Sequence, residues 1–196
     1  NVSEVEMNQE VTQYASFQAG ELENGYRGVY IDGVKSGNQM TTELVYWDPE
    51  EQKLQAPFYS SDSSNKISLT RPAGVTCMDI NEDGVIEIPA ARPFEGNAAA
   101  SNTVMPAMDE RAASSAAPAY ITQWQQYFPQ EKELVSIQNM YVNTEEGYYF
   151  LMPSSWLETV TGALEAGKRQ FIFSEWVVND EGVGASGAVI LKIGVF

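Results

Sequence analysis

The chain has 196 residues, 43% hydrophobic and 11% aromatic, which is enough apolar material for one large domain or two small ones. Its net charge is −16, from 27 acidic and 11 basic residues, and this balance argues against binding to nucleic acid or to anionic membranes. It has no histidine and one cysteine, so histidine-dependent catalysis, cysteine-rich zinc sites and intramolecular disulfides are excluded. Glycoside hydrolysis by carboxylates and binding of hard metal ions remain open.

Short β-like segments separated by turn signals fill the first ninety residues. The first segment, 11–19, is followed by Asn24-Gly25, a strong hairpin signal. Further segments are expected at 26–31, 40–47, 53–59, 67–71 and 75–80. Four consecutive strands with tight turns predict an antiparallel meander resembling a propeller blade, within a domain spanning 1–94.

The composition changes at residues 95–118, which are rich in Ala, Ser, Asn and Pro and poor in large apolar residues. Such a segment is typical of a linker or a long surface loop. Two interpretations remain open. Either this segment separates the domain 1–94 from a second one at 119–196, or a single domain carries one long loop.

The last part, 119–196, is expected to be a small β-rich domain with one or two short helices, so the whole chain is mainly β (α+β). The apolar residues of 120–128 recur at helical spacing, which predicts an amphipathic helix ending before Pro129. Strands are expected at 134–142, 148–152 and 187–196. Segments 159–165 and 169–178 could pair as a hairpin, and the alternative is a helix over 155–166.

The segment 79–87 is the sharpest motif in the chain. Oxygen-bearing side chains stand at its first, third, fifth and ninth positions, namely Asp79, Asn81, Asp83 and Glu87. Gly84 permits a sharp turn, after which the backbone carbonyl of Val85 could supply a further ligand. Hard oxygen ligands with several negative charges suit a structural calcium ion. The competing interpretation is a polar hairpin turn that holds no metal.

Several stretches resemble uncharacterised surface lipoproteins of gut Clostridia that carry FG-GAP/VCBS propeller-like repeats. The loop 79–87 is similar to the loops of those repeats and, more loosely, to EF-hand and dockerin loops, but its twelfth position is Ala90 rather than the closing glutamate of an EF-hand. The other stretches are 45–48, 71–72, 141–143, 147–150 and 153–156. The resemblance implies an extracellular protein anchored through an N-terminal lipid-modified segment that this sequence lacks, and it implies no particular reaction.

These features favour a non-catalytic extracellular module with a binding or structural role, stabilised by calcium and directed to a glycan or a protein partner. No catalytic residue is assigned, and this fragment is not expected to insert into a membrane. The alternative is a carboxylate-dependent glycan hydrolase or a carbohydrate-binding module. For carbohydrate binding, Trp47 beside Asp48-Pro49 is the best stacking candidate, whereas most other aromatic residues and Cys77 are expected in the core.

Overall fold

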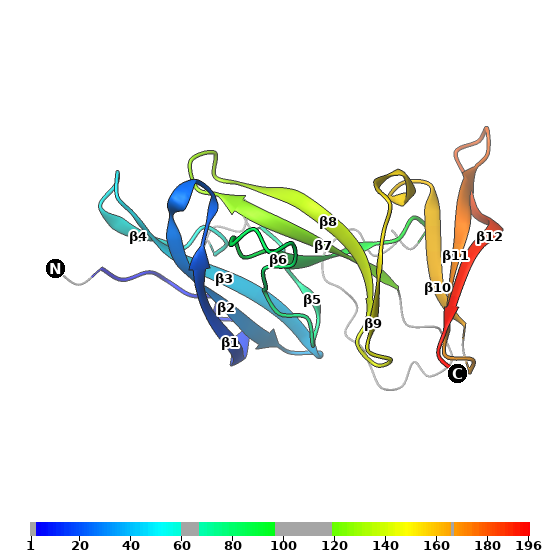
Figure 1. Cartoon of the computed structure of the whole chain (residues 1–196), viewed down its shortest axis with the longest axis horizontal. Coiled ribbons are helices and arrows are strands. Elements are labelled where there is room, and N and C mark those ends of the chain that lie inside the picture. Colours follow the sequence, from blue (N-terminus) through cyan, green and yellow to red (C-terminus); the bar gives the residue numbers. More distant parts are fainter. Residues whose placement is uncertain (1–2, 60–66, 97–118, 166) are drawn as a thin grey trace. The chain divides into compact units, whose positions relative to one another are not determined.

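The computed structural model describes residues 3–59, 67–96, 119–165 and 167–196, and most of them lie in antiparallel β-strands (Figure 1). The chain divides into two compact units: unit 1 comprises Asn1–Ala90 and Gln123–Ile137, and unit 2 comprises Ala91–Thr122 and Gln138–Phe196. Of the predicted linker 95–118, residues 97–118 lie outside the described residues. Within the described part of the chain, no helix has the length and apolar character needed to cross a membrane.

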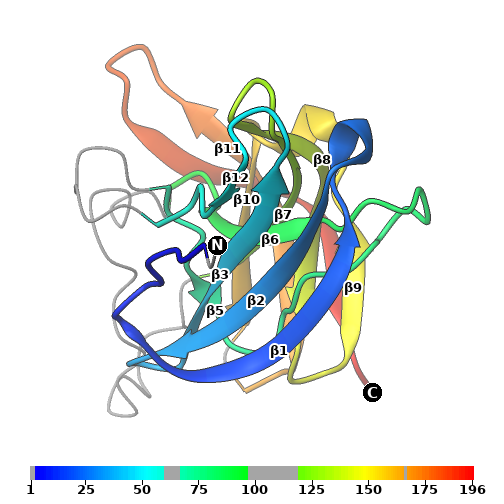
Figure 2. The same ribbon diagram turned by 90° about the vertical axis from the view of Figure 1, so that its left-hand side faces the viewer.

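The first sheet is the predicted antiparallel meander, which is confirmed (Figure 2). The strands follow the chain in the order β1-β2-β3-β4, and a short β5 pairs with β3. Their bounds are β1 (Val11–Glu21), β2 (Arg27–Lys35), β3 (Gln39–Asp48), β4 (Lys53–Gln55) and β5 (Arg71–Pro72). The turn between β1 and β2 contains Asn24 and Gly25, both with positive φ, which is the conformation that an Asn-Gly pair favours.

Three predicted strands of this region are shorter than expected or absent. Of the segment 67–71, only Arg71 lies in a strand, the two-residue β5. The strand predicted at 53–59 ends at Gln55, shortly before Pro57, which has no N–H for a ladder hydrogen bond. The segment 75–80 forms no regular strand, because two of its N–H groups point at carboxylates instead of at a neighbouring strand. The Cys77 N–H donates to Asp32, and the Ile80 N–H donates to Glu87.

The core of unit 1 lies against one face of this sheet. Tyr30 and Leu44 are opposite each other in the register of β2 and β3, and both are fully buried. They pack with Ile88, with Tyr127 and with Cys77, which is buried as expected. Full burial of side chains of this size contributes about 1.5–3 kcal/mol each relative to exposure. The meander therefore provides a rigid support for the loop that follows it.

A four-stranded sheet has the order β6-β7-β8-β9, with β6 (Ile88–Pro93), β7 (Tyr120–Phe128), β8 (Glu133–Asn143) and β9 (Tyr148–Leu151). The helix predicted at 120–128 is wrong, because this segment is β7. Its apolar residues at helical spacing are divided between the two faces of a strand: Trp124 is on one face, and Ile121 and Tyr127 are on the other. All three side chains are buried, so β7 has apolar residues on both of its faces, and together these residues mimic the spacing of a helix.

Unit 2 contains a third sheet in the order β10-β11-β12, with β10 (Val160–Glu165), β11 (Gln170–Val178) and β12 (Gly184–Gly194). The predicted hairpin is confirmed and the alternative helix over 155–166 is wrong, since only Ser154–Trp156 forms a short 3-10 turn. The core of unit 2 is aromatic. Tyr141 stacks on Phe171 with ring centroids 3.7 Å apart, and Phe94 and Phe173 pack around them.

Candidate metal centre

The loop 79–87 is closed at its base by a pair of backbone hydrogen bonds in unit 1. The Met78 N–H donates to the Glu87 carbonyl at 3.2 Å, and the Glu87 N–H donates to the Met78 carbonyl at 3.0 Å. Glu82 and Gly84 have φ values of 61° and 90°, so the chain reverses through two left-handed residues. A β-bridge between Glu21 and Val85 then attaches the returning segment to β1.

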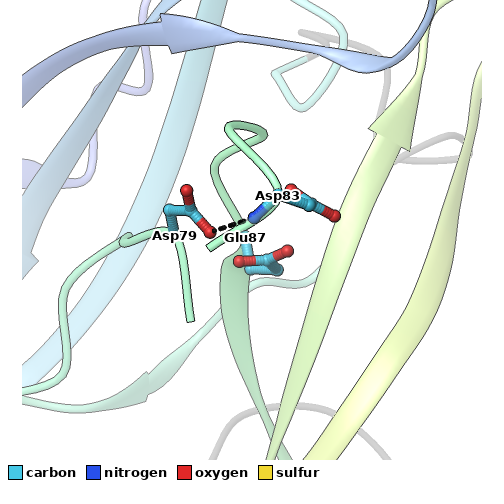
Figure 3. Close-up of side chains that lie close together, drawn as sticks. All are labelled: Asp79, Asp83 and Glu87. Carbon is cyan, nitrogen blue, oxygen red and sulfur yellow. Dashed lines mark hydrogen bonds between the residues drawn. The ribbon is translucent and has the colours of Figure 1, made fainter. Parts of the chain in front are cut away.

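Three carboxylates meet in this loop. One oxygen from each of Asp79, Asp83 and Glu87 lies within 4.8 Å of the others (Figure 3). Oxygens that share a calcium ion lie about 2.3–2.6 Å from it, so any two of them are at most about 5 Å apart. The spacing of the three side chains therefore fits a common calcium ligand shell.

Backbone N–H groups hold the two aspartates in place. The carboxylate of Asp79 accepts hydrogen bonds from the N–H groups of Asp83 at 3.2 Å and of Gly84 at 2.9 Å, and Figure 3 shows the first of these. Asp83 Oδ1 accepts the N–H of Val85 at 2.8 Å. A carboxylate oxygen that accepts one hydrogen bond keeps a second lone pair, so both side chains could still bind a cation.

Glu87 differs from the aspartates because its side chain is completely buried, with 0% exposure. Its Oε2 accepts the Ile80 N–H at 2.8 Å, and its Oε1 accepts the side-chain amide of Gln126 at 2.7 Å. The same Gln126 nitrogen donates to Asp83 Oδ2 at 2.9 Å. Gln126 belongs to β7 and thus links two of the acids from a strand that is distant in sequence.

The pKa values of the two acids that contact Gln126 are shifted in opposite directions. The pKa of Glu87 lies above its ordinary value, chiefly because the side chain is buried. The hydrogen bonds from Ile80 and Gln126 lower this pKa, whereas the nearby charges of Asp83 and Asp79 raise it. For Asp83, desolvation also raises the pKa, but hydrogen bonds from Val85, Gln126 and Asn81 outweigh it and lower the pKa. A cation would favour the charged form of both acids.

The other two predicted ligands, Asn81 and Val85, are not part of the carboxylate trio. The amide of Asn81 donates to Asp83 Oδ2 at 2.8 Å, and its oxygen accepts the Asp83 N–H at 3.1 Å, so the side chain is part of the loop network. Val85 contributes its N–H to Asp83, and a role for its carbonyl as a ligand stays a prediction. Ala90, the twelfth position, is buried in β6.

Sequence reasoning missed Gln126, because the helical interpretation of 120–128 placed it on a polar face. The available signal was the alternation of a strand, in which Gln126 shares a face with Trp124. Gln126 is 3% exposed. A buried amide requires polar partners, and two carboxylates supply them here.

Two further features bear on ligand binding in unit 1. A shallow surface pocket beside β4 is lined by Val5, Glu6, Lys53, Leu54, Gln55, Ala56 and Tyr59, so its walls contain one carboxylate. Trp47 is half exposed, and the strand registers place it on the same sheet face as Phe17 and Val29, which are also exposed. Most of the other aromatic residues are at least partly buried, and the exposed exceptions are Tyr14, Phe17, Tyr149 and Phe196.

Comparisons with known proteins gave no match, either to a protein-family model, to a curated protein or to a solved structure.

Proposed function

We propose that this chain is a non-catalytic extracellular module of a surface lipoprotein, and that a calcium ion bound by Asp79, Asp83 and Glu87 stabilises it. The observation that carries the proposal is the approach of the three carboxylate oxygens to within 4.8 Å of one another. The resemblance of the loop to those of FG-GAP/VCBS repeats and the acidic composition support it. We also propose that the meander is arranged like a blade of a β-propeller.

Electrostatics favour a cation at this position. Like charges at such separations repel, and the partial burial of the trio strengthens the repulsion because less water screens it. The amide of Gln126 and the backbone N–H groups compensate only in part, since each of them carries a partial charge. A divalent cation would offset two of the three negative charges and link the two aspartates to Glu87, which directly precedes β6.

A structural role receives more support than a catalytic one. Both oxygens of Glu87 accept hydrogen bonds and the side chain is fully buried, so a glycosidic oxygen has no route to it. Glycoside hydrolysis needs two carboxylates on opposite sides of the bond that breaks, about 5–10 Å apart with substrate between them. The carboxylates of this trio are instead gathered around one point.

The test is thermal unfolding of the whole chain in calcium, in magnesium and in chelator. A ligand that binds only the folded state stabilises it, by about 2.7 kcal/mol at a hundred times its dissociation constant. We expect a higher melting temperature in calcium than in chelator and little effect of magnesium, which prefers smaller octahedral sites.

Two matched variants complete this experiment. Asp83→Asn removes one ligand charge and should reduce the calcium-dependent shift, whereas Asp180→Asn makes the same change in an exposed turn and should leave the shift intact. An unchanged melting temperature at millimolar calcium would show that the loop does not bind calcium. A shift of equal size in both variants would place the ion elsewhere.

Carbohydrate binding is a second candidate, favoured by the exposure of Trp47 on the outer face of β3. A half-exposed indole next to other exposed apolar residues offers a flat surface on which a sugar ring can stack. A glycan array tests this function. Binding that Trp47→Ala abolishes and that Tyr149→Ala, an exposed aromatic residue of unit 2, preserves would support it. Absence of binding to any glycan would count against it.

A further inference from the structure

Strand β12 is a long edge strand whose exposed side chains are mostly apolar. Among the described residues its only strand partner is β11, so its other edge has no ladder hydrogen bonds (Figure 1). Val189 and Ile190 are exposed in the middle of the strand, while Leu191 and Ile193 pack against the core of unit 2. An open edge of this length and apolarity readily accepts a further strand.

Proteins commonly protect such an edge with charged side chains, and β12 has few. The chain has 27 acidic residues, yet none lies after Glu181, and the only charged side chain of β12 is Lys192. Elsewhere the net charge of −16 would keep two copies of the chain apart. β12 thus presents no carboxylate of its own to a second copy, and the Glu175 carboxylate of β11 lies beside Gly187.

The distribution of side-chain size along β12 favours an identical strand as the partner. The first half, 184–188, reads Gly-Ala-Ser-Gly-Ala, and the second half, 189–193, reads Val-Ile-Leu-Lys-Ile. In an antiparallel pair related by a two-fold axis at Val189, each residue of 185–188 lies opposite a large one of 190–193, while Gly184 lies opposite Gly194. Ser186, for example, lies opposite Lys192, so the two lysines do not meet.

We infer that β12 mediates a symmetric dimer in which two copies of the chain join antiparallel at this edge and extend the β10-β11-β12 sheet across the two-fold axis. Register shifts in the β11–β12 ladder increase the local twist of β12. Bulges commonly discourage the pairing of an edge with an unrelated strand, whereas a two-fold partner carries the same bulges and the same twist. The dimer does not depend on the calcium site, which lies in unit 1.

Sedimentation velocity over a wide range of protein concentration tests this inference. We expect a species of twice the mass of one chain that dissociates on dilution. Val189→Glu places two carboxylates opposite each other at the axis and should abolish the dimer. Val177→Glu makes the same charge change at a valine of equal exposure on β11, 52% against 54%, and should preserve it. Circular dichroism establishes that both variants fold.

A second measurement locates the axis directly. Val189→Cys should form a disulfide-linked dimer under mild oxidation, because opposite side chains in an antiparallel pair are close enough for a disulfide. Val177→Cys should not crosslink, and the native Cys77 is buried. A wild-type chain that is monomeric at every concentration would overturn the inference. That result would also be expected if the edge of β12 received a strand from a different protein. A dimer that Val189→Glu leaves intact would overturn it as well.

Discussion

The guanidinium of Arg71 lies 2.6 Å from the carboxylate of Asp32, and both side chains are buried inside unit 1. This ion pair joins β2 to β5. Its other polar atoms are also satisfied: Asp32 accepts hydrogen bonds from Ser16, Thr42 and the Cys77 N–H, and Arg71 donates to the carbonyls of Leu69 and Val75. Burial by itself raises the pKa of Asp32, but the Arg71 charge and these hydrogen bonds outweigh it and lower the pKa.

Removal of one partner of this pair should be strongly destabilising. Arg71→Met leaves the Asp32 charge buried without compensation, and we expect it to lower the free energy of unfolding by about 3–5 kcal/mol in urea denaturation. The matched control is Arg27→Met, which breaks the solvent-exposed pair with Glu21 and should cost about 0–1 kcal/mol.

The effect of Arg71→Met should also depend on pH. Because the folded pKa of Asp32 is lowered, the stability from its ionised form is present above the unfolded pKa and is lost as the pH falls through the folded one. The difference between Arg71→Met and wild type should therefore shrink in strong acid. A difference below about 1 kcal/mol at neutral pH would contradict this account of the pair.

Glu43 provides a pH dependence of the opposite sign. Its side chain is 3% exposed, its Oε2 accepts the Asn8 N–H at 2.8 Å, and its Oε1 has no partner among the described residues. Burial raises the pKa of Glu43 above its ordinary value, although the Asn8 N–H opposes this effect. The stability from this group is complete below the unfolded pKa and is lost as the pH rises through the higher folded pKa.

Glu43→Gln should therefore equal wild type in stability at low pH and exceed it increasingly as the pH rises to neutral. The amide keeps an acceptor for Asn8 without a buried charge. Unfolding midpoints measured at a series of pH values test this, with the exposed Glu158→Gln as control, which should show no such divergence. A constant difference between Glu43→Gln and wild type at all pH values would show that the side chain remains neutral or solvated.

Local sequence signals predicted the meander well because its strands are rich in β-branched and aromatic residues and are separated by recognisable turns. The Asn24-Gly25 turn and the hairpin of β10 and β11 belong to this group. The helix predicted at 120–128 failed because β7 buries residues on both faces, which removes the two-residue period. The division of the chain into units built from separate stretches depends on long-range pairing, which no local pattern reveals.

The loop acids were visible in the sequence because neighbouring residues bring them together. Asp79 and Asp83 meet through hydrogen bonds within the loop itself. Gln126 and the partners of Asp32 come from distant segments, so their identification required the register of strands that are far apart in sequence. Cys77 shows the same limit, since its burial was predicted but its contacts with Asp32 and Thr42 were not.

The two left-handed residues of the loop should respond oppositely to substitution. Gly84 has φ of 90° with open space around it, so Gly84→Ala meets no steric clash but adds backbone strain, about 1–2 kcal/mol. Glu82 already has φ of 61°, and Glu82→Gly should remove strain of similar origin. Melting in chelator separates these effects from metal binding. Equal changes of the same sign would mean that the loop conformation is not as described.

Gln126→Glu offers the sharpest test of the link between the buried amide and the trio. Without metal, the new carboxylate lies against Asp83 and Glu87 in place of a hydrogen-bond donor, so the free energy of unfolding should fall markedly in chelator. With calcium, the added negative charge becomes a further ligand, and the stabilisation by the ion should exceed that of wild type. Gln125→Glu makes the same change on the opposite face of β7 and should show neither effect. If Gln126→Glu were destabilised equally in calcium and in chelator, the amide would serve only to neutralise the acids, and the trio would be a hydrogen-bonded cluster without an ion.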